Sequence, residues 1–212
     1  PLTFPAISIV DPELMVSIPP RFTAYQGFDA FFHAAEGYIA NCATPISDLY
    51  ALEAIRLLYK YLPAAVADGH DLEARTNVAG MVESTSSCTS EHSMEHAMSA
   101  LYPALPHGAG LICLSKAYFE TFVDDSKDRY MKMAEVMTSE PAQQAGDFVD
   151  ALVKMQKACG MDQLKLSDWG LKEEDLPKMV QNAKATMGGL FQLDPRMLTD
   201  DEILAIYKKS YR

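Results

Sequence analysis

The chain has 212 residues, which is long enough for one domain with a sizeable core. Apolar residues make up 49% and charged residues 22%, proportions that are typical of globular proteins and too apolar for a disordered chain. The 29 acidic residues outnumber the 18 basic ones and give a net charge of −11. This charge repels phosphate backbones and anionic membrane surfaces, so we expect neither a nucleic acid nor a membrane as partner.

Four cysteines are widely spaced and form no C-x-x-C pair: Cys42, Cys88, Cys113 and Cys159. This spacing favours buried free thiols in a reducing cytoplasm over a disulfide framework or a set of zinc ligands. No stretch approaches the roughly 18 apolar residues that span a bilayer, and no charged-then-apolar leader opens the chain. Because the sequence starts at Pro1, we expect a processed protein or part of a longer one.

The first twenty residues differ from the rest of the chain. The β-branched run at 7–10 predicts a short strand, and Asp11-Pro12 predicts a brief turn or helix. Pro19-Pro20 then ends this stretch. We therefore interpret residues 1–20 as the trailing edge of another domain and residues 21–212 as the domain proper.

After residue 20 nearly every segment predicts a helix. Between 49 and 62, apolar residues recur at steps of three and four, which predicts an amphipathic helix that ends at Pro63. The polar run 84–90 is a loop candidate, with a helix that is weak in its middle as the alternative. Further helices are predicted at 22–40, 72–83, 91–101, 108–123, 148–159 with a Gly160 cap, and 203–207 after a capping box at Thr199. Strand signals are otherwise scarce, so we expect an all-α domain.

Two pairs of chemistry-bearing residues have the spacing of metal ligands. Asp29 and His33 are four residues apart in the predicted helix 22–40, and His92 and His96 are four apart in the helix 91–101. Residues i and i+4 lie on one face of a helix, so each pair can bind one ion. His70 stands apart from this pattern.

His107 is the remaining candidate ligand, and it is expected where the helix at 108–123 begins. The positive end of a helix dipole disfavours the charged imidazolium there, and a metal requires the neutral form. Three imidazole nitrogens and one carboxylate oxygen suit iron(II), zinc, nickel or cobalt. The four residues of this set are Asp29, His33, His92 and His107. The alternative is that these histidines only pack in the core or lie at the surface.

Several common site signatures are missing from the sequence. The residue after His92 is Ser93, so the zinc-protease motif H-E-x-x-H is not formed. There are no paired Glu-x-x-His motifs of di-iron bundles, no G-x-S-x-G elbow, and no Gly-rich phosphate-binding turn. The sequence therefore contains no residues that we assign to a nucleotide cofactor.

The order of motifs closely resembles the iron-containing (group III) alcohol dehydrogenases. The resemblance covers essentially the whole chain and rests on five motifs: VDPEL at 10–14, TAYQGFDA at 23–30, HAAEGY at 33–38, His92-x-x-x-His96, and PHGAG at 106–110. It implies the multi-helix, metal-binding C-terminal domain of this family, of the dehydroquinate synthase-like type. It also implies a missing N-terminal dinucleotide-binding domain, of which residues 1–20 would be the remnant and hinge.

The resemblance also assigns roles to individual residues. It implies that Asp29, His33, His92 and His107 bind the metal and that His96 lines the site, where it would orient substrate or relay a proton. His92 and His107 are fifteen residues apart, one more than in familiar members, so His96 remains the alternative third ligand. Glu36 is a candidate acceptor for a ligand imidazole, with a solvated or capping role as the alternative.

The implied activity is reversible hydride transfer between a primary alcohol or its aldehyde and NAD(P). The implied metal is a divalent ion, foremost Fe²⁺, with Zn²⁺, Ni²⁺ or Co²⁺ as alternatives. Without the nucleotide domain, the chain is expected to be inactive alone. The alternative class is a non-catalytic helical domain with a structural metal site. A homo-oligomer is compatible with the sequence, which does not define the oligomeric state, the alcohol, or the choice between NAD and NADP.

Overall fold

The computed structural model describes residues 6–79 and 87–211, and within these ranges it contains only helices and their connections. The α-helices are α1 (Pro20–Ile39), α2 (Pro45–Ala67), α3 (Leu72–Ala79), α4 (Ser90–Leu101), α5 (His107–Thr121), α6 (Lys127–Thr138), α7 (Asp147–Ala158), α8 (Leu176–Met187) and α9 (Asp200–Ser210). The 3-10 helices are η1 (Pro12–Met15), η2 (Leu166–Trp169), η3 (Glu173–Asp175) and η4 (Gly188–Gln192). The predicted all-α fold is therefore confirmed.

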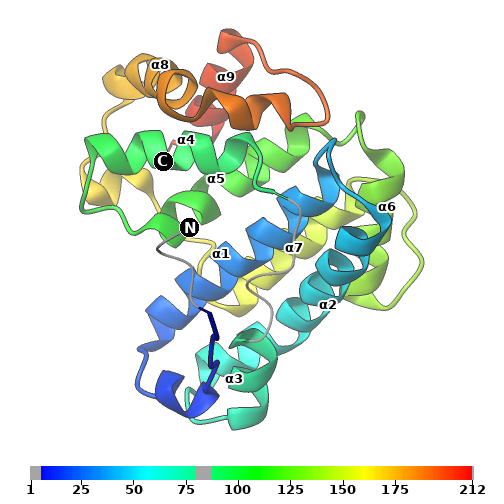
Figure 1. The fold of residues 1–212 in the computed structure, drawn as a ribbon. Helices are drawn as coiled ribbons and strands as arrows, with labels where there is room; N and C mark the ends of the chain where they lie inside the picture. The colour runs from blue at the N-terminus through cyan, green and yellow to red at the C-terminus, as the bar shows by residue number, and fades with distance from the viewer. Residues whose placement is uncertain (1–5, 80–86, 212) are drawn as a thin grey trace.

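Helix α1 runs through the middle of the molecule and packs against both α2 and α5 (Figure 1). It begins at Pro20, which suits the first turn because the N–H that proline lacks would have no partner there. Phe31 and Phe32 are fully buried, and Phe32 stacks on Phe119 of α5 while Phe31 stacks on Phe148 of α7. These ring contacts hold α1 in the core and fix which of its faces points outward.

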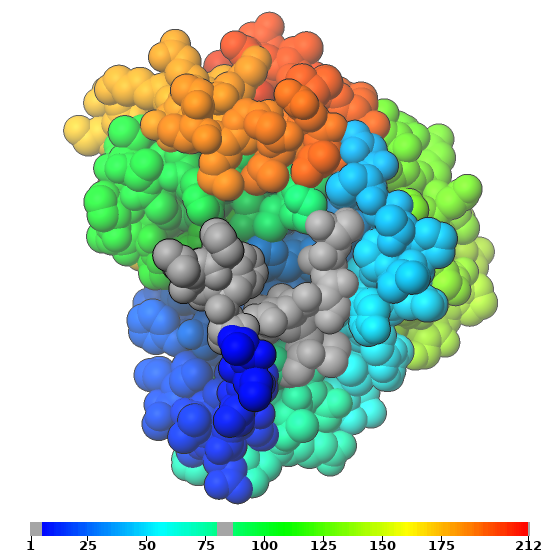
Figure 2. Space-filling model, in the orientation of Figure 1, coloured from blue at the N-terminus to red at the C-terminus, as the bar shows by residue number. Residues whose placement is uncertain are grey.

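Helix α4 is held from the other side by the C-terminal helices. The hydroxyl of Tyr207 in α9 donates to the carbonyl of Met94 at 2.8 Å, and Ser93 Oγ donates to the carbonyl of Ala183 in α8 at 2.9 Å. In Figure 2 the C-terminal segments (orange and red) cover the green α4 and α5, and the blue and cyan N-terminal helices form the lower part. Helices α4 and α5 are thus fixed between α1 and the C-terminal region.

Most of the predicted helices are found within a few residues of their expected ends. Gly160 follows α7 in the left-handed conformation with φ of 68°, and Thr199 forms the predicted capping box with Glu202. Residues 80–83 of one predicted helix and 84–86 of the predicted loop lie outside the described residues, while 87–89 form no regular structure. Helices α6 and α8 are present in the structure but are not among the helices that the sequence predicts.

Two predictions at the level of elements are wrong. Helix α2 does not end at Pro63 but continues to Ala67, because the buried Leu62 and Ala65 hold its last turn in the core despite the missing proline N–H. Residues 7–10 form no strand: they are exposed, and no neighbouring strand exists in the described ranges to complete a ladder. The brief helix expected after Asp11 is present as η1.

No helix in the described part of the chain is both long and apolar enough to cross a membrane.

Candidate metal centre

Helix α1 presents Asp29 and His33 on its one partly open face. The two residues are one turn apart, and Asp29 Oδ1 lies 3.6 Å from His33 Nε2. Every other residue between Gly27 and Ile39 is buried, whereas the side chains of this pair are each 32% exposed. In this part of α1, Asp29 and His33 are therefore the side chains that remain partly accessible.

Two further helices bring imidazoles to the same carboxylate oxygen. His92 lies in the first turn of α4, with Nε2 3.3 Å from Asp29 Oδ1, and His107 is the first residue of α5, with Nε2 3.4 Å from that atom. Gly108 permits this approach, since a Cβ there would lie 2.2 Å from the carbonyl oxygen of Tyr25 in α1. The structure thus brings together all four residues that the sequence nominated as ligands.

The distances from Asp29 Oδ1 and the donor chemistry both suit a divalent ion. Asp29, His92 and His107 form one group of mutually close ligand atoms, and His33 adjoins this group through its contact with Asp29. Tetrahedral ligands about 2.0–2.1 Å from an ion are about 3.3–3.4 Å from one another. Asp29 Oδ1 lies between 3.3 and 3.6 Å from the three Nε2 atoms. Three imidazole nitrogens with one carboxylate oxygen form a set that iron(II) and zinc both accept.

Two buried glutamates orient two of the imidazoles. Glu36 Oε2 accepts a hydrogen bond from His92 Nδ1, and Glu95 Oε2 accepts one from His107 Nδ1. Both carboxylates are completely buried. An imidazole that donates from Nδ1 has its lone pair on Nε2, the atom that faces Asp29 in both residues. Of the two roles considered for Glu36, the structure therefore supports that of acceptor for an imidazole.

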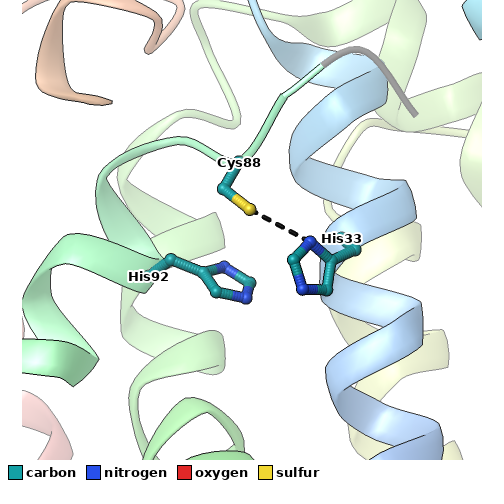
Figure 3. A group of neighbouring side chains, drawn as sticks. All are labelled: His33, Cys88 and His92. Carbon is teal, nitrogen blue, oxygen red and sulfur yellow. Dashed lines mark hydrogen bonds between the residues drawn. The ribbon is translucent and has the colours of Figure 1, made fainter. Parts of the chain in front are cut away.

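The third imidazole has a thiol in the equivalent place. Cys88 Sγ lies 3.0 Å from His33 Nδ1, and Figure 3 shows the sulfur directed at this ring atom from the segment that leads into α4. The rings of His33 and His92 lie side by side with centroids 4.3 Å apart. All three imidazoles thus have a neighbour at Nδ1, which leaves Nε2 to face the common carboxylate.

A buried chain of hydrogen bonds continues behind Glu36. Its Oε1 accepts from the backbone N–H of Thr89 at 3.0 Å and from the Thr89 hydroxyl at 2.9 Å. That hydroxyl is 2.7 Å from the hydroxyl of Tyr118, which in turn lies 2.9 Å from Asp194 Oδ1. The backbone N–H of Ser90 also donates to Asp194 Oδ1 at 3.0 Å. The first turn of α4, which carries His92, is therefore tied to both α1 and the C-terminal region.

His96 lies at the rim of the centre and not among the converging atoms. It is exposed, and its ring meets that of His107 edge-on with centroids 5.1 Å apart. The part of the ring that is covered by protein loses hydration, and this loss together with the neighbouring charge of His107 lowers the pKa of His96. His70 is remote from the cluster, and its nearest charged neighbour is Asp68. Of the i, i+4 pair on α4, His92 contacts Asp29 Oδ1, whereas His96 lies close to Glu95 and His107.

The carboxylates determine the ionisation of the histidines. Burial raises the pKa of Asp29, and hydrogen bonds from His107 and His92 lower it. The lowering effects together are larger, so the pKa of Asp29 is well below its ordinary value. Burial lowers the pKa of His107, whereas its bonds to Asp29 and Glu95 raise it to about 9. His107 is the first residue of α5, where the helix dipole disfavours imidazolium as predicted, and the two adjacent carboxylates act in the opposite direction.

Sequence reasoning missed two of these contacts. Cys88 was interpreted only as a small buried residue, although it is half-buried beside His33. Glu95 was not considered, although it lies three residues after His92 and thus on the same side of α4. This spacing was the one signal in the sequence that could have identified Glu95 as a neighbour of the site.

Comparisons with known proteins show similarity to one family over most of the chain. The family model described as "Fe-containing alcohol dehydrogenase family, C-terminal" matches residues 23–211. The 1,3-propanediol dehydrogenase of Klebsiella pneumoniae is 33% identical, over 98% of this chain and 55% of that protein. The NAD-dependent methanol dehydrogenase of Bacillus methanolicus is 31% identical, over 97% of this chain and 56% of that protein.

A solved structure shows the same fold. An archaeal alcohol dehydrogenase from a Red Sea brine pool, ADH/D1 bound to NZQ, superposes with a TM-score of 0.90 and 32% identity, over 98% of this chain and 55% of that one. The chain spans about half the length of the curated relatives it matches. The chain therefore belongs to the Fe-containing alcohol dehydrogenase family and corresponds to its C-terminal, all-α part.

Proposed function

We propose that this chain is the metal-binding part of an NAD(P)-dependent alcohol dehydrogenase that interconverts a small primary alcohol and its aldehyde. The observation that carries the proposal is the convergence of three Nε2 atoms on Asp29 Oδ1, each within 3.6 Å. Relatives are named for 1,3-propanediol and for methanol, which are small primary alcohols. Because the chain matches only about half of these relatives, the activity is assigned to the longer protein.

Asp29, His33, His92 and His107 are the proposed ligands of one divalent ion, with Fe²⁺ as the first choice and Zn²⁺, Ni²⁺ or Co²⁺ as alternatives. When bound, such an ion supplies a Lewis acid that polarises the oxygen of the substrate. Glu36 and Glu95 hold His92 and His107 in the tautomer that leaves Nε2 free to bind. Asp29 contributes the one negative charge among the four ligands.

His96 is the proposed residue for contact with the substrate. It lies at the rim beside His107 and is exposed, so it can orient an alcohol or accept its proton without binding the ion. Its lowered pKa favours the neutral imidazole, which is the form that accepts a proton.

The nucleotide would be bound by a preceding domain, of which we interpret residues 1–20 as the remnant. The sequence offers no Gly-rich turn for phosphates, and one relative is named as NAD-dependent. The four cysteines lie in the described part of the chain and form no disulfide there, and we propose the reducing cytoplasm that their spacing predicts.

The alternative is a structural ion in a non-catalytic helical domain. Structural sites are closed by protein ligands, whereas catalytic sites keep a position open. The side chains of Asp29 and His107 are 32% and 36% exposed, which favours an open site.

Metal analysis of point variants tests the proposed ligand set. We expect the parental chain to bind about one transition ion, because tetrahedral centres take four ligands. His92→Ala should lose most of the bound ion, since it removes one of the convergent nitrogens. His96→Ala is the matched control on the same face of α4 and should retain it. If His92→Ala retained the ion, or if only His96→Ala lost it, the assignment of His92 as a ligand and of His96 as a residue that does not bind the ion would be overturned.

A further inference from the structure

The partner of His33 differs in kind from those of the other two imidazoles. His92 and His107 donate to the buried carboxylates of Glu36 and Glu95, whereas His33 Nδ1 faces Cys88 Sγ at 3.0 Å (Figure 3). Cys88 belongs to the segment 87–89 that precedes α4, and it reaches α1 across 55 positions of sequence. One of the three Nδ1 atoms is therefore held by a thiol where the others have a carboxylate.

We propose that Cys88 is a positioning residue for the metal centre, whose sulfur accepts the Nδ1 hydrogen of His33 and so directs the Nε2 lone pair toward Asp29. This inference rests on the proposed metal site. A neutral imidazole carries one hydrogen, and ligation through Nε2 requires that this hydrogen be on Nδ1. Without an acceptor at that position, the other tautomer and other ring orientations compete with the one that binds the ion.

Local charge explains why a thiol suits this position. Asp29, Glu36 and Glu95 already place three carboxylates around the three imidazoles. Glu91 adds a fourth carboxyl group, which is fully buried and has no hydrogen-bond partner for either oxygen in the described structure. A further carboxylate at position 88 would add repulsion to this group, since like charges that share a site disfavour ionisation. A cysteine sulfur can accept the hydrogen bond of His33 without placing a further carboxylate in this group.

Cys88 could instead bind an ion directly, since its sulfur and one nitrogen each of His33 and His92 lie within 4.8 Å of one another. Two features favour the positioning role. The sulfur and nitrogen ligands of one tetrahedral ion are about 3.5 Å apart, as bonds of about 2.3 and 2.0–2.1 Å require. The observed 3.0 Å is shorter and corresponds to a hydrogen-bond contact. An ion between Cys88 and Nδ1 would also leave the Nε2 atom of His33, 3.6 Å from Asp29, unused.

Titration of the 212-residue chain with Co²⁺ tests this role. Cys88→Ala removes the acceptor, and Cys88→Val removes it while filling the space of the sulfur. Each should weaken Co²⁺ binding by about tenfold or more, which is the usual effect of losing the partner of a ligand imidazole. Cys88→Ser restores an acceptor and should bind within about threefold of the parental chain, well inside that range. The exposed Cys42→Ser is the matched control and should bind like the parent.

Two further readouts separate positioning from other roles. Thermal unfolding without metal should be alike in Cys88→Ala and Cys88→Ser, because the acceptor matters for the ion and not for the core. A thiolate-to-Co²⁺ absorption band in the near ultraviolet that disappears in Cys88→Ser would show direct ligation and overturn the proposal. Parental affinity in both acceptor-free variants, or an equal loss in Cys88→Ser, would also overturn it.

The variant Asp29→Ala distinguishes failure of the proposal from failure of the proposed function. If Asp29→Ala abolishes Co²⁺ binding while the Cys88 variants do not affect it, the metal centre stands and only the role of Cys88 is refuted. If Asp29→Ala binds Co²⁺ like the parent, the metal centre itself is refuted.

Discussion

Asp29 is the residue on which the centre depends most directly. Its Oδ1 atom lies within 3.6 Å of all three converging Nε2 atoms. The histidines come from three helices, and the Nδ1 atom of each contacts a side chain, which is a carboxylate for two of them and a thiol for the third. This arrangement fixes the ring orientations before an ion arrives, and so it reduces the ordering that binding requires.

Gly108 allows His107 to reach this point. A Cβ on Gly108 would lie 2.2 Å from the carbonyl oxygen of Tyr25, so Gly108→Ala must push α5 away from α1. We expect a loss of about 1–3 kcal/mol in the free energy of unfolding, as for other overpacked contacts, together with weaker metal binding as His107 moves from Asp29. Denaturant unfolding and a Co²⁺ titration measure the two effects.

Gly189→Ala is the matched control for this substitution. A Cβ at Gly189 would meet no atom within 4 Å, so its free energy of unfolding should change by less than about 0.5 kcal/mol. Equal stability and equal Co²⁺ affinity of Gly108→Ala and the parent would refute the close-approach argument.

At the scale of elements, α1 and α4 carry most of the residues of the centre. Helix α1 carries Asp29, His33 and the acceptor Glu36, while α4 carries His92 and Glu95. The position of α4 against α1 is set in part by the chain of hydrogen bonds from Glu36 to Asp194. The proposed ion site is thus linked through hydrogen-bonded side chains to the segment between α8 and α9.

Asp194 should make the stability of the fold depend on pH. Burial raises the pKa of Asp194 from 3.8 to about 7, against hydrogen bonds from Ser90 and Tyr118 that lower it. Tyr118 donates to Asp194 Oδ1, whereas Asp194 Oδ2 is buried and has no hydrogen-bond partner in the described structure, so a proton is accommodated on Oδ2.

The sign of the pH effect follows from proton binding. Between pH 3.8 and about 7 the folded chain keeps a proton on Asp194 that the unfolded chain has released. The contribution of Asp194 to stability therefore falls as pH rises across this interval and is constant above it. Asp194→Asn is uncharged at every pH, so its stability relative to the parent should improve across the same interval. Thermal unfolding in a pH series measures this difference, and a constant difference would contradict it.

At the scale of the whole molecule, the chain is acidic and contains one proposed cation site. The net charge of −11 favours the approach of a cation over that of a phosphate. In the proposed function two roles are divided: this chain would supply the ion site, and a dinucleotide-binding domain would hold the hydride acceptor.

We therefore expect the 212-residue chain to bind a metal ion but to show no turnover with NAD⁺ or NADP⁺ and 1,3-propanediol or methanol. The physical reason is that the sequence has no Gly-rich turn to bind the phosphates of the dinucleotide. The absorbance of reduced nicotinamide measures the reaction. Turnover by the loaded chain that disappears in Asp29→Ala would refute this division of roles.

Helical periodicity made much of this architecture predictable, but it did not determine the depth at which each residue lies. The spacing of His92 and His96 puts both on one side of α4, yet His92 is buried where the helix meets α1 and His96 is exposed one turn later. The His33–Cys88 contact joins residues 55 positions apart, so no local pattern could indicate it. Pro63 removes one backbone hydrogen bond, which predicts a helix end. Helix α2 nevertheless continues because the turn beyond Pro63 is buried, and the local pattern does not indicate that burial.

The most direct test of the central claim is a crystal structure of the Co²⁺-loaded chain, with the ion located by anomalous scattering at the cobalt edge. We expect one ion at about 2.0–2.2 Å from Asp29 Oδ1 and from the Nε2 atoms of His33, His92 and His107, since these are ordinary ligand distances for such an ion. An ion bound by Cys88 or His96 instead, or one that does not touch Asp29, would contradict the account.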